Sequence, residues 1–381
     1  MQFIDLNAQQ RLIRGKIESN IKKVLDHGKY IMGPEVKELE EKLAEYVGVK
    51  YAISCASGTD ALLMSLMAYG IKAGDYVITT PFTFIATAEV ITLLGAKPIF
   101  VDIDEKTYNI DPEKIEIFLK NPADPLTNKA IELDRIKGII PVDIFGLPAD
   151  YDRINKIAKK YNMFVIEDAA QSFGAEYKSK KACSLANIGC TSFFPAKPLG
   201  CYGDGGMIFT NNDEIADILK SIRIHGQGKD KYDNTRIGIN GRLDTIQAAI
   251  LLAKFEIFAE EIDLRQKVAE RYSNALKDKF YLQVVPDDCK SVWAQYSIRL
   301  KEVNSKQRND YIELLKTQDI PASIYYLKPL YIQHVFNNFT YMKRDFYMSE
   351  KVSKNIFSIP MYPYLSKNNQ ERITKILNAK V

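Results

Sequence analysis

The chain has 381 residues, of which 46% are hydrophobic and 26% charged, and its formal net charge is +4. A composition this balanced is ordinary for a globular protein and gives no electrostatic reason to expect a nucleic-acid binder. At roughly 100–200 residues per domain, the length suggests two or three domains, or one large and one small domain.

Cysteine spacing and hydropathy exclude further classes. The five cysteines include no Cys-x-x-Cys pair, so we expect neither a disulfide framework nor a zinc site, and no other metal. The first residues, MQFIDLNAQQRLIRGK, lack the apolar segment of a signal peptide. No apolar run approaches the ~18 residues that a membrane-spanning helix needs. We therefore expect a cytoplasmic protein that does not contact membranes.

The first fifty residues predict two helices. Apolar residues such as Ile17 and Ile21 recur at helical spacing through residues 7–31. A second helix is predicted over residues 33–48, with Gly33-Pro34 as its start signal.

From residue 50 onward, short apolar strands alternate with helical patterns. This alternation predicts a mostly parallel sheet with helices on both faces, in which ligands bind at the carboxyl ends of the strands. The expected strands are 51–55, 76–80, 98–103, 138–145 and 163–169, and the expected helices are 58–70, 84–95 and 151–162.

The second half of the chain predicts one more strand of the large domain and then a smaller α+β domain. We expect a strand at 206–211, a helix at 213–226, a polar loop at 226–242 and a long helical stretch from 244 to 277, broken near Phe255. Residues 280–381 carry a weaker β signal, with one strand at 294–300 and helices near 307–317 and 367–378. We divide the chain into a large domain, 1–250, and a small domain, 251–381.

A lysine in unusual surroundings is the first chemical signal. The segment 192-SFFPAKPLGCYGDGG-206 places Lys197 between two prolines, after two phenylalanines and before a glycine-rich turn. A lysine kept from water has a lowered pKa, because burial disfavours the charged form. Its neutral amine can attack an aldehyde and form a Schiff base. The common alternative is a solvated surface lysine.

An acidic residue at a strand end is the second signal. Asp168 follows the apolar run of 164-FVIEDAAQSFGA-175. A carboxylate fixed there would hold a cation, and a pyridinium nitrogen fits, because the carboxylate keeps that nitrogen protonated. Asp168 and Lys197 could then hold opposite parts of one pyridoxal ring. A helix cap or a salt bridge is the alternative role for Asp168.

Two strand-to-helix junctions complete the set. In 54-SCASGTDAL-62, Gly58 allows close approach of the backbone, and Thr59 adds a hydroxyl at a helix N-terminus suited to a phosphate. In 81-PFTFIAT-87, an aromatic side chain could stack on a planar cofactor. The alternatives are an ordinary helix cap and an ordinary core aromatic.

With these motifs in order, the sequence resembles the DegT/DnrJ/EryC1/StrS family of sugar aminotransferases, in its surface-polysaccharide subgroup. The resemblance covers nearly the whole chain and is carried by GTDAL, FTFIATAEV, EDAAQSFGA, SFFPAKPLGCYGDGG and NGRLDTIQAAIL. It implies a fold of the aspartate-aminotransferase type (fold type I): a three-layer α/β sandwich with a mostly parallel sheet, plus a smaller C-terminal α+β domain. It also implies pyridoxal 5'-phosphate as cofactor.

The resemblance implies a role for each matching position. Lys197 is expected to be the Schiff-base lysine and the acid–base catalyst, and Asp168 the partner of the pyridine nitrogen. The remaining expected contacts are Gln171 with the ring hydroxyl, Phe84 with the ring face, Gly58, Thr59 and Ser192 with the phosphate, Asn240 with the phosphate of a neighbouring subunit, and Arg242, Tyr325 and Tyr326 with the sugar.

The implied reaction is transamination, with glutamate as amino donor, a nucleotide-linked keto sugar as acceptor and a homodimer with shared active sites. One branch of the family has histidine in place of the lysine and dehydrates sugars, so Lys197 favours amine transfer over that alternative. A regulatory protein that keeps the fold without activity is a further alternative.

The exact sugar is the least determined feature. Members that act on 3-keto glucuronic acids tend to carry a His-Tyr-Pro segment, whereas this chain reads 324-IYYLKPLY-331, with Tyr325 in place of the histidine. The absence of that possible cation, and the segment 141-PVDIFGLPADYD-152, favour a UDP-linked 4-keto-6-deoxy-N-acetylhexosamine. The product would be a 4-amino sugar for bacterial surface polysaccharide such as O-antigen or capsule. The alternative is 3-amination of a UDP-2-acetamido-3-keto-glucuronic acid, with Arg242 or Lys328 meeting the carboxylate.

Overall fold

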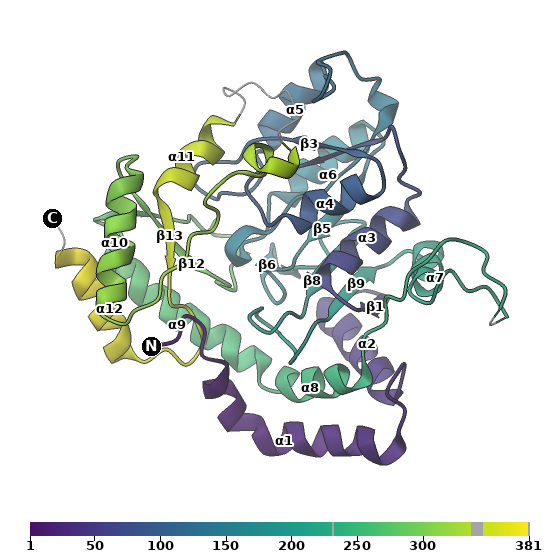
Figure 1. Cartoon of the computed structure of the whole chain (residues 1–381), viewed down its shortest axis with the longest axis horizontal. Helices are drawn as coiled ribbons and strands as arrows, with labels where there is room; N and C mark the ends of the chain where they lie inside the picture. The colour runs from purple at the N-terminus through teal and green to yellow at the C-terminus, as the bar shows by residue number, and fades with distance from the viewer. Residues whose placement is uncertain (231, 337–345, 380–381) are drawn as a thin grey trace.

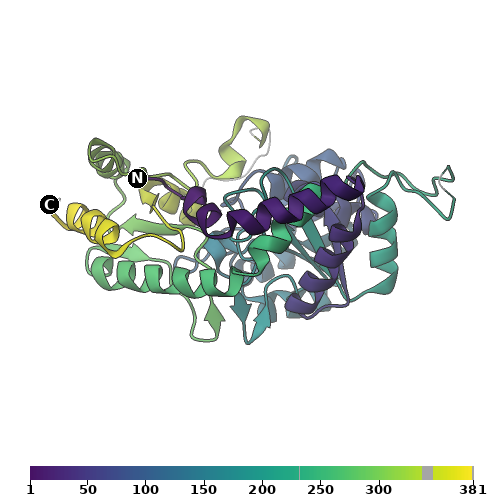
Figure 2. The same cartoon turned by 90° about the horizontal axis from the view of Figure 1, so that it is seen from below.

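The computed structural model describes residues 1–230, 232–336 and 346–379. A larger body is built around a seven-stranded sheet, and a smaller body around a three-stranded sheet lies beside it (Figure 1). The two bodies meet along the line where α8 leads into α9, near the N-terminus of the chain (Figures 1 and 2).

The large sheet is mixed but mostly parallel, as the sequence predicts. Its strand order is β1-β9-β8-β5-β4-β2-β3. Strand β9 runs antiparallel to both of its neighbours, whereas the other adjacent pairs are parallel. The strands are β1 (Tyr51–Cys55), β2 (Tyr76–Thr79), β3 (Lys97–Phe100), β4 (Ile136–Ile139), β5 (Phe164–Asp168), β8 (Ile188–Ser192) and β9 (Gly206–Thr210).

Alternating side chains of the sheet bury two separate helical layers. Ala52 and Phe209 face the layer of α2 and α8, whereas their neighbours Ile53 and Ile208 face the layer of α3, α4 and α7. This period of two is the ordinary geometry of a strand and yields a three-layer sandwich. The helices of the large body are α1 (Leu6–His27), α2 (Pro34–Val47), α3 (Gly58–Ala68), α4 (Ala86–Leu93), α5 (Pro112–Lys120), α6 (Tyr151–Lys160), α7 (Asp213–Ile222) and α8 (Thr245–Phe255).

Most predicted elements of this body are present, with three differences. The strand expected over 138–145 ends at Ile139, and a 3₁₀ turn occupies Ile144–Gly146. Pro141 helps to end the strand, because it has no N–H to donate to a neighbouring strand. Two further elements were not predicted: helix α5, which starts after the capping residue Asp111, and strand β8, whose small residues give little β signal.

The small body combines helices with an antiparallel sheet of order β10-β12-β13. The break expected near Phe255 is present, because α8 ends there and α9 begins at Phe258. The domain division proposed after residue 250 falls within α8. Strands β10 and β13 and helix α11 were not predicted. The elements are α9 (Phe258–Leu276), β10 (Phe280–Leu282), β12 (Tyr296–Leu300), α10 (Ser305–Thr317), α11 (Tyr347–Asn355), β13 (Ile356–Ile359) and α12 (Lys367–Ala379).

Short elements and an extended arm complete the description. A three-stranded ribbon consists of β6 (Glu176–Tyr177), β7 (Lys180–Lys181) and β11 (Cys289–Lys290), and other 3₁₀ turns lie at Leu133–Arg135, Leu330–Ile332 and His334–Phe336. Residues 226–230 and 232–242, which lie between α7 and α8 and are called the arm, project away from the large body (Figures 1 and 2). None of the described helices is long and apolar enough to cross a membrane.

Candidate active site

The predicted catalytic residues gather at one edge of the large sheet. Strand β5 ends at Asp168, which pairs with Cys190 of the parallel strand β8. Strand β8 ends two residues later at Ser192, and the turn that follows carries Lys197. The carboxyl ends of β5 and β8 therefore bring the predicted ring carboxylate, the phosphate hydroxyl and the lysine into one neighbourhood, the usual place for a ligand in such sheets.

The carboxylate of Asp168 is buried and held by hydrogen bonds. Thr87 Oγ1 donates to Asp168 Oδ2 at 2.7 Å, and the backbone N–H of Ala170 donates to Oδ1 at 3.2 Å. Burial raises the pKa of Asp168, while the Thr87 and Ala170 bonds and the charge of Lys197 oppose that rise. A buried carboxylate without an ion pair is suited to accept a cationic N–H from a bound ring.

The side chain of Lys197 is prepared to react as an amine. Its backbone N–H donates to the carbonyl of Phe194 at 2.9 Å, which closes a tight turn between Pro195 and Pro198. Burial lowers the pKa of Lys197, and the nearby charge of Asp168 only partly opposes this shift. The lysine is therefore less protonated near neutral pH than a solvated one, as the sequence predicts.

The segments predicted to form a phosphate cradle at the start of α3 lie close together. A Cβ added at Gly58 would lie 2.6 Å from the Cβ of Ser192, so only glycine allows these two segments to approach so closely. Ser57 caps the helix by accepting the N–H of Asp60 at 2.9 Å. Thr59 is half-buried in the same turn. The free N–H groups and the helix dipole make this junction suitable for a phosphate.

Gln171 links the predicted cofactor site to the predicted sugar site. Its Oε1 accepts the backbone N–H of Phe145 at 2.8 Å, and its Nε2 donates to the hydroxyl of Tyr326 at 3.1 Å. Burial raises the pKa of Tyr326, so this hydroxyl keeps its proton at neutral pH. Phe84 lies just before α4 and is 58% exposed, so its ring is accessible from solvent.

The other predicted substrate residues differ in their surroundings. Arg242 is half-buried, and its buried Nε has no hydrogen-bond partner among the described residues. Tyr325 packs near Phe3 and beside Tyr326, so it has a packing role in the isolated chain. Asn240 is exposed and paired with Ile224 at the base of the arm. Asn240 is thus not brought to the phosphate cradle by contacts within the described part of its own chain.

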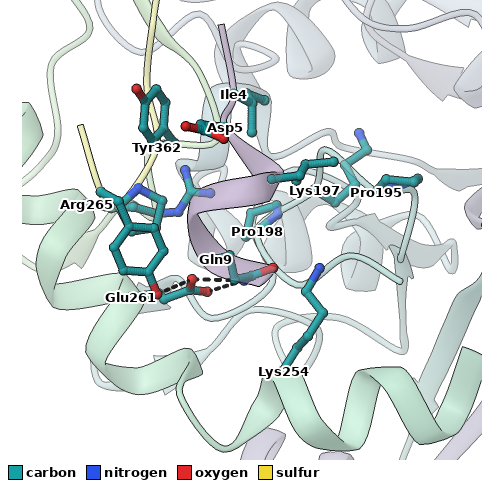
Figure 3. A pocket seen from close by; sticks show the side chains of 13 residues that line it. Ile4, Asp5, Gln9, Pro195, Lys197, Pro198, Lys254, Glu261, Arg265 and Tyr362 are labelled. Carbon is teal, nitrogen blue, oxygen red and sulfur yellow. Dashed lines mark hydrogen bonds between the residues drawn. The ribbon is translucent and has the colours of Figure 1, made fainter. Parts of the chain in front are cut away.

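A small cavity borders Lys197 on the side of the N-terminal helix (Figure 3). Its volume is about 20 Å³, and Lys254, Glu261 and Gln9 contribute to its wall. Gln9 Nε2 donates to both carboxylate oxygens of Glu261 at 2.8 Å, whereas Gln9 Oε1 has no partner among the described residues. Lys254 points toward Gln9 in Figure 3, and burial lowers its pKa to about 8. This cluster fastens the N-terminal helix to α8 and α9.

Three features of the site were not anticipated from the sequence. Thr87 lies inside a motif that the sequence analysis quoted, but only the fold shows that its hydroxyl reaches Asp168. Lys254 lies in an apolar helix. Its position within that apolar pattern was the available sign of its burial in the sequence. A buried pair of carboxyl groups, Asp143 and Glu167, lies behind this edge of the sheet.

The residues present fit a pyridoxal-phosphate cofactor. Lys197 would supply the amine for the aldehyde, Asp168 would supply a buried carboxylate for the ring nitrogen, and the close approach of Gly58 and Ser192 would leave room for the phosphate. Together with the mixed, mostly parallel sheet, this site defines a pyridoxal-phosphate enzyme of the aminotransferase class. Among the described residues, no group of three or more His, Cys, Asp or Glu side chains is arranged to hold a metal ion.

Comparison with known proteins places the chain within that class. The profile of the DegT/DnrJ/EryC1/StrS aminotransferase family matches residues 12–378, and the chain belongs to this family. It is 50% identical to the UDP-2-acetamido-2-deoxy-3-oxo-D-glucuronate aminotransferase of Pseudomonas aeruginosa over 366 residues, 96% of either protein. The chain is therefore an aminotransferase that uses pyridoxal phosphate.

Solved structures confirm the predicted fold type. A family aminotransferase from Brucella abortus is 46% identical, with a TM-score of 0.93 over 99% of this chain and 98% of that one. The ntda protein of Bacillus subtilis, solved with bound cofactor PMP, is 28% identical, with a TM-score of 0.87 over 99% of this chain and 84% of that one.

Proposed function

We propose that this enzyme transfers the amino group of glutamate to the 3-position of a UDP-linked 2-acetamido-3-keto-glucuronic acid. The observation that carries the proposal is the 50% identity with the P. aeruginosa aminotransferase, which extends over 96% of both proteins. This relationship favours the 3-keto uronate, the alternative raised by the sequence, over the 4-keto-6-deoxy sugar that Tyr325 first suggested. The product would serve the assembly of a surface polysaccharide such as lipopolysaccharide.

Arg242 supports a substrate that carries a carboxylate. Its guanidinium is half-buried, and its Nε lies buried without a partner in the described part of the chain. An unpaired guanidinium is matched in charge and geometry to a carboxylate, which it can bind through two N–H groups. We assign the uronate carboxylate to Arg242, which makes a histidine at position 325 unnecessary.

We assign the following roles to the chain's own residues. When bound, pyridoxal phosphate supplies the aldehyde that carries the amino group and the ring that accepts an electron pair. Asp168 holds the proton on the ring nitrogen, and Thr87 keeps the carboxylate in place. Lys197 Nζ moves the proton between the sugar carbon and the carrier, as both base and acid.

The remaining residues of the site bind and orient. The start of α3, with Gly58 and Thr59, binds the phosphate together with Ser192. Gln171 contacts the ring hydroxyl while it is held by Phe145 and Tyr326. Phe84 covers one face of the ring and excludes water from it.

We further propose a homodimer in which each arm completes the site of its partner. Tyr232 and Ile237 of the arm are 88% and 84% exposed, which is unusual for large apolar side chains and is explained if a second copy covers them. Asn240 stands on the same arm and would meet the partner's phosphate. Sedimentation analysis should give a dimer, and a stable monomer with full activity would contradict this arrangement.

A panel of matched sugars tests the substrate assignment. UDP-linked 3-keto N-acetylglucosamine, its uronate and a UDP-linked 4-keto-6-deoxy sugar are each incubated with glutamate and enzyme, and products are read by mass. We expect the uronate to be aminated with the highest kcat/KM. Faster turnover of the 4-keto-6-deoxy sugar would overturn the assignment, and the Lys197→Ala variant supplies the baseline without amine transfer.

A further inference from the structure

Two buried carboxyl groups lie immediately behind the catalytic edge of the sheet. Asp143 follows strand β4, and Glu167 is the residue before Asp168 on β5. Both side chains are completely buried. The backbone of Asp143 donates its N–H to the carbonyl of Asp168 at 3.1 Å, so the pair is joined directly to the segment that carries the catalytic carboxylate.

Asp143 organises the chain on both sides of the site. Its Oδ1 accepts the N–H of Ala149 at 2.9 Å and the hydroxyl of Tyr151 at 2.8 Å. Its Oδ2 accepts the hydroxyl of Ser172 at 2.7 Å. Ser172 directly follows Gln171, so this bond fixes the end of the segment 168–172.

Glu167 is held by the backbone of a different segment, residues 183–185. The backbone N–H of Cys183 donates to Oε1 at 2.6 Å, and that of Leu185 donates to Oε2 at 3.0 Å. The two carboxyl groups also lie near enough for each to shift the pKa of the other. A hydrogen bond between two carboxyl groups requires a proton on one of them, because ionised carboxylates only accept.

No cation compensates the pair. None of the ion pairs among the described residues includes either carboxyl group. The other titratable groups that their charges reach are Tyr151, Cys183, Cys190 and Cys289, none of which is a cation. Burial raises the pKa of both carboxyl groups, and the charge of Asp143 raises that of Glu167 further. Two adjacent buried carboxylates cannot both ionise at low cost.

We propose that Asp143 and Glu167 share one proton and together act as positioning residues for the segment 168–172, which presents Asp168 and Gln171 to the cofactor. The pair contacts neither cofactor nor substrate. It ties β4, β5 and the segment 168–172 into one unit with a single net negative charge. The proposal rests on the cofactor site and is independent of which sugar is aminated.

The hydrogen bonds predict that the two carboxyl groups tolerate an amide differently. In Asp143→Asn, Oδ1 keeps its two donors, and Nδ2 can donate to Glu167 and to the oxygen of Ser172, because a hydroxyl can also accept. In Glu167→Gln, one backbone N–H must face an amide NH₂, because each carboxylate oxygen already accepts from a backbone N–H. We expect Asp143→Asn to fold and bind cofactor like the parent, and Glu167→Gln to lose stability.

Proton counting tests the shared proton. The raised pKa means that the folded state keeps a proton that the unfolded state releases, so stability contributed by the pair is lost as pH rises above the unfolded pKa values. Between about pH 5 and 7, the stability of the parent protein should fall more steeply with pH than that of Asp143→Asn. The difference between the two slopes should correspond to about one proton released on unfolding. The shared proton would be excluded if the parent and Asp143→Asn released equal numbers of protons on unfolding. It would also be excluded if Asp143→Asn and Glu167→Gln were equally stable.

Cofactor binding tests the positioning role. Asp143→Ala should bind pyridoxal phosphate at least about tenfold more weakly and shift its visible absorption band, and Asn at the same position should restore both. Ser172→Ala, a milder change that removes one bond to Asp143, should shift the band in the same direction. A folded Asp143→Ala protein with the parent's affinity and spectrum would reduce the pair to a structural element. If the parent itself bound no pyridoxal phosphate, the cofactor assignment would fail while the proton count would still decide the pair.

Discussion

The hydroxyl of Thr87 donates to Asp168 Oδ2 at 2.7 Å, across 81 residues of sequence. This bond leaves the carboxylate in a fixed orientation at the end of β5, with Oδ1 held by the N–H of Ala170. Thr87 lies on the first turn of α4, the helix that also follows Phe84. The short segment 84–87 therefore carries both the residue that holds the predicted ring carboxylate and the predicted ring cover.

Replacing Thr87 should weaken catalysis without removing the cofactor. In Thr87→Val the carboxylate of Asp168 loses its side-chain donor, and a lost hydrogen bond to a charged group costs about 1.5–3 kcal/mol. We expect kcat to fall about tenfold or more, while Thr87→Ser restores most of the activity. Steady-state kinetics at saturating substrate measures the effect. Unchanged kcat in the valine variant would show that Asp168 needs no fixed orientation.

Lys197 should be both the covalent attachment point and the proton carrier. Lys197→Ala removes the amine, so turnover should fall by at least about 10³-fold, within the range of general acid–base contributions. Borohydride treatment of the parent should label the peptide that contains Lys197 and no other. Label found on the buried Lys254 instead would place the reactive amine elsewhere.

Gly58 should be irreplaceable in the phosphate cradle. An alanine Cβ would lie 2.6 Å from the Cβ of Ser192, and such overpacking costs about 1–3 kcal/mol. Affinity for pyridoxal phosphate in Gly58→Ala should therefore fall about tenfold, as measured by equilibrium titration. Gly15→Ala is the matched control, because nothing lies within 4 Å of its added Cβ and affinity should not change.

Lys254 should cost the protein stability in a pH-dependent manner. Burial lowers its pKa from 10.5 to about 8, so the folded state disfavours its charge. This penalty is complete below about pH 8 and disappears as pH rises toward 10.5, where the unfolded lysine also loses its proton. Lys254→Met should be more stable at neutral pH, by up to about 3 kcal/mol, since one pKa unit corresponds to ~1.4 kcal/mol.

The pH series separates this penalty from simple repacking. Chemical denaturation of parent and Lys254→Met at pH 7, 8.5 and 10 should give a stability difference that shrinks with pH. Lys16→Met, at an exposed ion pair with Glu256, should change stability by less than about 0.5 kcal/mol throughout. A difference for Lys254→Met that is constant with pH would exclude the buried charge as its cause.

The sequence predicted part of the edge of the sheet at which Asp168 and Lys197 meet. Asp168 ends an apolar strand, and ligands bind at the carboxyl ends of parallel strands, but strand β8, which leads to Lys197, was not predicted. The bond from Gln171 to Tyr326 spans 155 residues, and no periodicity predicts such a contact between domains. The early end of β4 was missed because the apolar run continues past Ile139, where the regular pairing gives way to an isolated bridge between Val142 and Asp168.

Sequence patterns could not predict the buried charges either, because these also depend on contacts between distant segments. Asp143 follows β4 and Glu167 lies on β5, and only the pairing of these two segments turns two ordinary acids into a pair. Lys254 occupies an apolar helical stretch in which a lysine commonly extends its charged end to water. Its burial depends on the N-terminal helix, which packs onto α8 from more than two hundred residues away.

The projecting arm has a genetic consequence. In the proposed dimer each subunit uses its own Lys197 and its partner's Asn240. Mixed dimers of Lys197→Ala and Asn240→Ala subunits would hold one site with both substitutions and one site with neither. Two inactive proteins, or two defective alleles of one gene, should therefore restore activity when combined.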